Sequence, residues 1–384
     1  MKILADNTIP YLRGILEDVA DIAYIDSKEF TPERVKEADA LVVRSIDKCT
    51  RKLLEGSHVR LITTATIGFD HIDTHYCEQA GIEWHNAPGC NAESVGQYVL
   101  ASLLEVALRR GETLRGKTIG IVGVGHVGRI VERLCLAMGM HVLRNDPPRA
   151  EREGSERFVS LDTIAREADI ITLHVPLTRE GDHPTYHLAD ATFFRKLKRK
   201  PWFVNSCRGA AHDTQALLDA KRTGLISELI VDCWENEPNI NRDLLDLTAI
   251  ATPHIAGFSA DGKANGTRSC LEQIARFFGV QLDKLPHVTP PAPAHPVIDL
   301  QSFGKQRVAQ AVLRTYSPLL IDDALRQSPA HFEWFRSHYD HPREFPAYEV
   351  IHATPEEADT LHALGFRTRA IASPAPCKSA PSPR

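Results

Sequence analysis

Lys117-Thr-Ile-Gly-Ile-Val-Gly-Val-Gly-His-Val-Gly-Arg129 carries the clearest structural signal in this 384-residue chain. A strand-like run at 118–122 leads into a Gly-x-Gly-x-x-Gly turn, and an amphipathic helical pattern follows at once. The turn consists of Gly123, Gly125 and Gly128. In such turns the first glycine permits the tight bend, the second lets backbone approach a pyrophosphate, and the third allows close helix–strand packing. The phosphates would then lie on the N–H groups of a helix that opens near His126.

The glycine pattern alone could also belong to an ordinary tight turn. Asp146 favours a dinucleotide-binding turn instead. It ends the next apolar run, 18 residues after Gly128. A carboxylate in this position bonds ribose hydroxyls and repels a 2′-phosphate. We therefore expect NAD as the cofactor in preference to NADP, although Arg149 nearby weakens that argument.

Strand-like and helical runs alternate along most of the chain, as in an α/β protein with parallel sheets. Six strand-like runs match the count of a full doubly wound Rossmann domain. These runs lie at 118–122, 140–145, 170–174, 202–205, 229–232 and 249–251. Three earlier runs, at 3–5, 40–43 and 61–64, precede a long helical pattern that ends at Gly111.

We expect three folded units followed by a disordered tail. Residues 1–92 and 258–285 would form the substrate domain, because a helix expected at 262–278 can return to it, and residues 93–257 would form the NAD-binding Rossmann domain. Five prolines between 285 and 296 are typical of a semi-rigid linker. Residues 286–372 would form a C-terminal α+β domain. The Pro- and Ser-rich residues 373–384 would be disordered.

Composition is typical of a soluble globular protein and gives no sign of a nucleic-acid or membrane partner. The net charge of −5 provides no general basic field for nucleic acid or anionic lipid. The N-terminal residues turn polar too early for a signal peptide, and no apolar run is long enough to span a bilayer. The eight cysteines lack a Cys-x-x-Cys pair, so we expect reduced thiols in a cytoplasmic protein, without a metal site.

Polar residues follow several expected strands in the second half of the chain, and three of them suit hydride chemistry on a 2-hydroxy acid. Arg208 can fix a carboxylate through a bidentate guanidinium fork. His254 can accept the hydroxyl proton near neutral pH as hydride leaves the carbon. Glu237 can hold the tautomer of that histidine and favour its charged form. Each alone would more commonly be structural, but the carboxyl ends of parallel strands open into one crevice.

The order and spacing of these motifs resemble those of the D-isomer-specific 2-hydroxyacid dehydrogenases. The similarity covers most of the chain and includes Thr64-Ala-Thr-Ile-Gly-Phe-Asp-His-Ile-Asp73, Ala87-Pro-Gly-Cys-Asn-Ala92, Asp146-Pro-Pro-Arg149, Asn205-Ser-Cys-Arg-Gly-Ala210 and His254-Ile-Ala-Gly-Phe258. The resemblance implies NAD-dependent oxidation of 4-phospho-D-erythronate to 3-hydroxy-2-oxo-4-phosphooxybutanoate, in pyridoxal 5′-phosphate biosynthesis. It also implies a flavodoxin-like substrate domain and a homodimer formed through the C-terminal domain.

The same resemblance implies which residues contact the ligands. Cofactor contacts would come from Gly123, Gly125, His126, Val127, Gly128, Asp146, His174, Ser206, Cys207, Arg208, Asp232 and Gly257. Substrate contacts would come from Ser45, Thr66 and Phe258, with Arg44 on the same subunit. Arg343 would reach the substrate phosphate of the other subunit, or else be an ordinary solvated arginine.

Two positions depart from the family pattern. Phe258 stands where the family usually has tyrosine, so one hydroxyl contact to the substrate is missing. Gly96-Gln97, in the long helix, replaces a branched residue and a carboxylate. A helical glycine costs about 1 kcal/mol relative to alanine, which indicates close packing at that point.

Two alternatives to this function stay open. One is another D-2-hydroxyacid dehydrogenase, of the phosphoglycerate or hydroxypyruvate type. The C-terminal domain that follows the proline-rich linker argues against it. The other is a non-enzymatic, NAD-sensing binding protein on the same fold, which could retain the same three polar residues.

Overall fold

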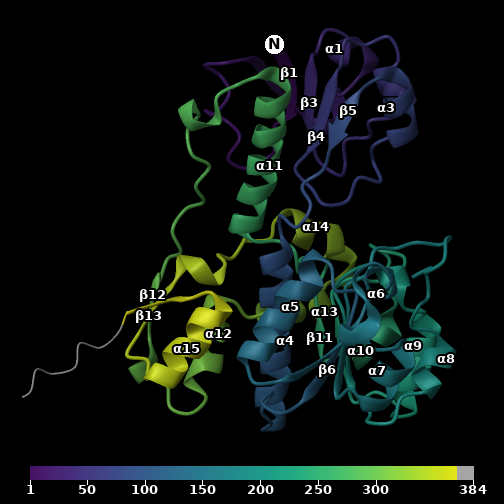
Figure 1. The fold of residues 1–384 in the computed structure, drawn as a ribbon, viewed down its shortest axis with the longest axis vertical. Helices are drawn as coiled ribbons and strands as arrows, with labels where there is room; N and C mark the ends of the chain where they lie inside the picture. Colours follow the sequence, from purple (N-terminus) through teal and green to yellow (C-terminus); the bar gives the residue numbers. More distant parts are fainter. Residues whose placement is uncertain (370–384) are drawn as a thin grey trace, which may run out of the picture.

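Three parallel sheets, each with helices packed against it, make up the part of the chain that the computed structural model describes, residues 1–369 (Figure 1). The tail that we expect to be disordered, at 373–384, lies outside the described residues. No helix within residues 1–369 is long and apolar enough to cross a membrane.

The first sheet contains five parallel strands in the order β2-β1-β3-β4-β5, which is the flavodoxin-like order. The strands are β1 (Lys2–Asp6), β2 (Asp21–Ile25), β3 (Ala40–Val43), β4 (Leu61–Thr64) and β5 (Glu83–His85). The short helices of this lobe are α1 (Pro32–Val35), α2 (Arg51–Leu54) and α3 (Thr74–Ala80). The strands β3 and β4 are buried at every position, as expected for central parallel strands covered on both faces.

Helix α11 (Ala260–Phe278) returns to this first sheet after the second sheet has ended. Its residues Leu271 and Ile274 belong to the same buried cluster as Ile3 and Leu61. In Figure 1 the helix runs from the middle of the molecule up to the N-terminal lobe. Its first turn therefore lies at the junction of the lobes, where the site described below is found.

The second sheet contains six parallel strands in the order β11-β10-β9-β8-β6-β7. They are β6 (Thr118–Val122), β7 (His141–Asn145), β8 (Ile170–Leu173), β9 (Trp202–Asn205), β10 (Glu228–Val231) and β11 (Ile250–Ala251). All six strands expected from the sequence are confirmed. In the 3-2-1-4-5-6 strand order a further strand pairs with the outer edge of β7. Here Val159 N donates one backbone hydrogen bond to the Arg144 carbonyl on that edge, at 2.7 Å, and the sheet ends at β7.

Helices α4 (Ala92–Arg110) and α5 (His126–Ala137) pack closely against each other beside this sheet. A Cβ built at Gly96 would lie 2.5 Å from Ile130 Cγ2, so the close packing expected at this glycine is confirmed. Helix α4 ends at Gly111, whose φ of 66° is the left-handed conformation that favours glycine. The remaining helices of this lobe are α6 (Pro147–Glu153), α7 (Leu161–Glu167), α8 (Ala191–Arg195), α9 (Thr214–Arg222) and α10 (Arg242–Leu247).

The third sheet, of β12 (Val297–Asp299), β13 (Glu349–Ile351) and β14 (Arg367–Arg369), follows the proline-rich segment. The helices of this part are α12 (Arg307–Thr315), α13 (Leu319–Gln327), α14 (Phe332–Ser337) and α15 (Pro355–Leu364). We expected an α+β arrangement, whereas its strands are all parallel and β13-α15-β14 is a strand–helix–strand unit. Phe345 and Leu361 of this part share a buried cluster with Val131 of α5, so it packs directly on the second lobe.

Candidate active site

A cleft of about 650 Å³ lies between the carboxyl ends of the first and second sheets. This is where ligands bind in open parallel sheets. The predicted site residues that line it are Ser45, Thr66, His126, Val127, His174, Ser206, Cys207, Arg208, Asp232, His254, Gly257 and Phe258. The structure therefore brings together residues from both lobes of the chain.

The glycine turn has the geometry that a bound dinucleotide requires. Gly123 adopts a φ of 87°, and a Cβ there would lie 2.5 Å from the His174 carbonyl oxygen. A Cβ at Gly128 would overlap the Gly123 carbonyl oxygen, so only glycine allows the helix to start so close to the strand. A Cβ at Gly125 would meet nothing within 4 Å, which leaves that backbone open to a ligand. The residues present thus fit a pyrophosphate.

Asp146 follows β7 and ties the glycine turn to the next helix. One carboxylate oxygen accepts a hydrogen bond from Val124 N at 2.8 Å, and the other accepts one from Arg149 N at 3.1 Å. Arg149 Nη1 in turn donates to the Val124 carbonyl at 2.6 Å, and its other guanidinium nitrogens bond Glu153. The charge of Arg149 is therefore met within the protein, which reduces its weight as a ligand for a 2′-phosphate.

Two buried polar atoms in the cofactor half of the cleft lack a hydrogen-bond partner among the described residues. They are His174 Nδ1 and Ser206 Oγ. Burial lowers the pKa of His174 to about 3, so the ring is neutral, and its Nε2 bonds Thr172 Oγ1 at 2.9 Å. Unpaired buried polar atoms are costly, so atoms of this kind facing a cleft are suited to meet the polar groups of a ligand.

The histidine–glutamate pair predicted from the sequence is formed. His254 Nδ1 lies 2.8 Å from Glu237 Oε2, and Trp234 N donates to Glu237 Oε1 at 2.6 Å. One carboxylate oxygen of Glu237 is thus fixed by a backbone N–H, and the other orients the ring of His254. Because Nδ1 is engaged, Nε2 is the nitrogen left to exchange a proton with a substrate.

Arg208 extends from the end of β9 toward the loop that follows β4. A Cβ built at Gly68 would lie 3.5 Å from Arg208 Nη2, so the guanidinium reaches the opposite lobe. Its Nη1 donates to the Cys207 carbonyl at 2.8 Å, which fixes one side of the group. The rest of the fork can receive a carboxylate in the cleft.

Asp232 holds the backbone of the loop that carries His254. Its carboxylate accepts hydrogen bonds from Ile255 N at 2.8 Å, Ala256 N at 3.0 Å and Thr252 Oγ1 at 2.6 Å. Burial raises the pKa of this carboxyl group. His254 itself has a φ of 56°, and these bonds keep the loop in that uncommon conformation.

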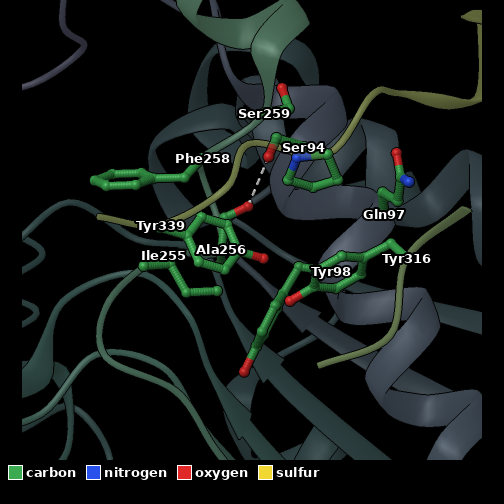
Figure 2. Close-up of a pocket in the computed structure, with 10 residues that line it drawn as sticks. Ser94, Gln97, Tyr98, Ile255, Ala256, Phe258, Ser259, Tyr316 and Tyr339 are labelled. Atoms are coloured by element: carbon green, nitrogen blue, oxygen red, sulfur yellow. Dashed lines mark hydrogen bonds between the residues drawn. The ribbon is translucent and has the colours of Figure 1, made fainter. Parts of the chain in front are cut away.

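A small cavity of about 10 Å³ lies behind this loop, where the C-terminal part meets α4 (Figure 2). Tyr98, Tyr316 and Tyr339 line it, and Ser94 Oγ donates to the Ala256 carbonyl at 2.8 Å. A volume of this size accepts a single water molecule. The cavity is therefore part of the support of the loop, and the larger cleft is the ligand site.

Donor atoms of Cys233, Glu237 and His254 lie within 4.8 Å of one another, a spacing that a metal ion could use. Burial, and then the charges of Asp232 and Glu237, raise the pKa of the Cys233 thiol well above its usual value. A zinc-type site needs the thiolate. The hydrogen bond between the other two residues already explains their proximity.

The substrate-side residues are only partly where the sequence suggested. Ser45 and Thr66 line the cleft, and Thr66 Oγ1 donates to the Gly68 carbonyl at 2.9 Å. Arg44 forms an ion pair with Asp6 at 3.3 Å, just outside the lining. Arg343 forms a two-pronged ion pair with Asp261, at 2.8 and 2.9 Å, and does not line the cleft of its own chain.

Five further residues with charged, imidazole or amide side chains line the cleft, and sequence reasoning missed them: Asp70, His71, Asn91, Lys263 and Arg336. Asn91 packs against Gly257, where a Cβ would overlap its amide. It lies in the stretch 87–92 that carries part of the family resemblance, so it could have been found. Lys263 and Arg336 come from α11 and α14, and no motif pointed to them.

Comparison with known proteins agrees with this geometry. The family described as D-isomer specific 2-hydroxyacid dehydrogenase, NAD binding domain, matches residues 100–256. The chain is 53% identical to the erythronate-4-phosphate dehydrogenase of Porphyromonas gingivalis over 367 residues, which is 95% of this chain and 100% of that protein. It is 51% identical to the protein of the same name from Bacteroides thetaiotaomicron, over 91% of this chain and 99% of that one.

Among solved structures, the chain resembles D-lactate dehydrogenase from Aquifex aeolicus in complex with NAD and lactic acid. The TM-score is 0.59 and the identity 27%, over 76% of this chain and 100% of that one.

Proposed function

The chain belongs to the erythronate-4-phosphate dehydrogenases, within the D-isomer specific 2-hydroxyacid dehydrogenases, and from this premise we propose how its residues carry the reaction. The enzyme is an NAD-dependent oxidoreductase of pyridoxal 5′-phosphate biosynthesis. Its substrate is 4-phospho-D-erythronate, and its product is 3-hydroxy-2-oxo-4-phosphooxybutanoate.

The cofactor half of the cleft would hold NAD through the turn at 123–128 and through Asp146, His174 and Ser206. Gly125 leaves backbone open for the pyrophosphate, and the carboxylate of Asp146 suits ribose hydroxyls. When bound, NAD supplies the hydride acceptor of the reaction. Asp232 and Gly257, which line the cleft near His254, would contact the nicotinamide end.

The substrate half performs the acid–base chemistry. Arg208 binds the carboxylate of the hydroxy acid and orients the carbon that bears the hydroxyl group. His254 Nε2 takes the hydroxyl proton while the hydrogen on that carbon leaves with its electron pair as hydride. Glu237, 2.8 Å from Nδ1, stabilises the imidazolium that results. Ser45 and Thr66 contact the rest of the substrate.

The observation that carries this proposal is the meeting of Arg208 and a glutamate-supported His254 in one cleft with the glycine turn. Initial rates of NADH formation test it, with 4-phosphoerythronate and 3-phosphoglycerate as competing substrates. We expect kcat/KM to favour 4-phosphoerythronate by at least ~100-fold. A preference for 3-phosphoglycerate would contradict the assignment, and no turnover of either would favour a binding protein.

We propose further that the protein is a homodimer assembled through residues 286–369. Two large apolar side chains in this part support the proposal, since Leu320 is 85% exposed and Trp334 is 55% exposed. Sedimentation velocity should give twice the chain mass for the wild type and a lighter species for Leu320→Glu. Arg343 would then be able to reach the substrate phosphate of the other subunit, as the resemblance implies.

We also propose which part of the chain binds each ligand. Residues 1–92 and 258–285 bind the substrate, residues 93–257 bind NAD, and the C-terminal residues contribute to assembly. We also propose a cytoplasmic location. The seven cysteines within the described residues are unpaired, which suits a reducing compartment.

A further inference from the structure

Two cations that the reaction does not otherwise use flank the ring of Phe258 in the cleft. Lys263 Nζ lies 4.0 Å from the ring centroid, and Arg336 Cζ lies 5.9 Å from it. All three residues line the cleft. We propose that Lys263 and Arg336 of the same chain form the subsite for the substrate phosphate, which makes them the residues that select a phosphorylated hydroxy acid. This inference rests on the function proposed above.

Lys263 carries a charge that the protein leaves without a carboxylate. Within residues 1–369 its ammonium has the Phe258 ring as its partner and forms no ion pair. Burial, followed by the charges of Arg44 and Arg336, lowers its pKa to about 8. An ammonium held among other cations in a partly desolvated place is unfavourable on its own. A phosphate dianion would reverse that imbalance and stabilise the charged form.

Arg336 presents a donor that has no acceptor. Its Nε is buried without a hydrogen-bond partner among the described residues, whereas its Nη1 lies 3.2 Å from Glu333 Oε1. A buried guanidinium N–H of this kind gains a charge-assisted bond when a phosphate oxygen arrives. One side of the guanidinium is thus anchored to Glu333, and the residue lines the cleft.

The other basic side chains nearby do not offer a second site for the phosphate. His341, whose ring lies 5.8 Å from that of Phe258, has its pKa lowered to about 4 by burial and by the charge of Lys263, so it is neutral. Arg44 forms an ion pair with Asp6 and does not line the cleft. Arg343 is paired with Asp261 outside the cleft. Lys263 and Arg336 are therefore the Lys and Arg side chains, besides Arg208, that line the cleft.

The substrate is charged at both ends, so it requires two sites for anionic groups. Arg208 and His254 would hold the carboxylate and the reacting carbon. Lys263 comes from the first turn of α11, the helix that returns to the first sheet, and Arg336 comes from α14 in the C-terminal part. A four-carbon acid with a terminal phosphate needs a second anion site of this kind, whereas an unphosphorylated acid does not.

Substrate discrimination tests the proposal. We would measure kcat/KM for 4-phosphoerythronate and for erythronate, and KM against kcat, in wild type, Lys263→Met and Arg336→Gln. Each variant should lose about 10- to 100-fold in kcat/KM for the phosphorylated substrate, mainly through KM, with erythronate changed less than about 3-fold. Lys263→Arg should restore much of the loss. Inorganic phosphate should inhibit the wild type in competition with 4-phosphoerythronate, and both variants more weakly.

Two exposed residues of matched chemistry serve as controls, because Lys305→Met and Arg314→Gln should leave both substrates unaffected. NADH binding by fluorescence confirms that each variant is folded. Equal losses for both substrates, or unchanged discrimination, would overturn the phosphate subsite while leaving the proposed function intact. The same loss in Arg343→Gln, with none in Arg336→Gln, would assign the role to the other subunit and overturn it as well. Absence of wild-type turnover would instead reject the function itself.

Discussion

The two walls of the cleft are built in different ways. The part of the cofactor wall that would receive the pyrophosphate and the ribose comes from one contiguous stretch, residues 118–146, and its distinguishing features are backbone conformations: a φ of 87° at Gly123 and a contact at Gly128 that admits no Cβ. The substrate wall is assembled from side chains on separate elements, among them Ser45, Lys263 and Arg336. The site for the pyrophosphate and ribose is therefore a local property of the chain, whereas substrate choice depends on how distant parts are packed together.

Replacing His254, the proton acceptor, should have the largest effect on turnover. It should also separate catalysis from cofactor binding most clearly. We expect His254→Ala to lower kcat by ~10²–10⁴, because the hydroxyl proton then has no positioned base. The dissociation constant for NADH, measured by fluorescence titration, should change little, since the glycine turn is untouched. A variant with near-normal turnover would remove His254 from the mechanism.

Arg208→Lys should come next, with kcat/KM lower by ~10- to 100-fold. The charge is kept, but a lysine cannot form the two parallel hydrogen bonds that orient a carboxylate. Steady-state kinetics with 4-phosphoerythronate gives the measurement, and NADH titration gives the control. If kcat/KM is unchanged, the carboxylate must bind elsewhere.

On the cofactor wall, two glycine substitutions should separate folding from binding. In Gly128→Ala the added methyl group overlaps the Gly123 carbonyl, so we expect a loss of about 1–3 kcal/mol in stability and weaker NADH binding. Gly125→Ala has open space around its Cβ, so Tm should stay within about 2 °C while NADH affinity falls. Equal Tm values for both variants would show that the turn is not as tightly packed as described.

The smallest effect should appear away from the cleft, at the contact between α4 and α5. In Gly96→Ala the new Cβ would lie 2.5 Å from Ile130 Cγ2 and 3.1 Å from Leu134 Cδ1. The cost of overpacking, about 1–3 kcal/mol, should exceed the gain of about 1 kcal/mol in helix propensity. We therefore expect a Tm lower by about 2 °C with kcat unchanged. Gly304→Ala, outside any helix and with nothing within 4 Å, is the control for an added methyl group that meets no neighbour, and a higher Tm for Gly96→Ala would contradict the packing.

The contrast between the walls also explains what the sequence could reveal. Central strands such as β3 and β9 are continuous apolar runs and were predictable, whereas β5 (Glu83–His85) and β14 (Arg367–Arg369) are short, polar edge strands that carry no such signal. The packing at Gly96 was predictable because glycine is costly in a helix. The expected α+β arrangement of the last unit was wrong in its detail, since strand direction depends on pairing that three-residue strands do not encode.

The same reasoning applies to the site. Arg208, Glu237 and His254 follow strands of one sheet, so the rule for carboxyl ends of parallel strands brings them together. Lys263 and Arg336 lie on helices that reach the cleft only through the packing of α11 and α14. Gln97, read as a departure, donates to Thr315 Oγ1 at 3.0 Å and so joins α4 to the C-terminal part. A partner so far along the chain cannot be inferred from local pattern.

A deuterium-transfer experiment tests whether the substrate passes its hydride directly to the cofactor on the opposite wall of the cleft. The purified protein would be incubated with NAD and 4-phosphoerythronate deuterated at the carbon that bears the reacting hydroxyl group. Mass spectrometry of the reduced cofactor should show one deuterium per NADH formed, because the hydrogen moves directly from substrate to nicotinamide. Unlabelled NADH with deuterium released to water, or no reduced cofactor, would contradict the account.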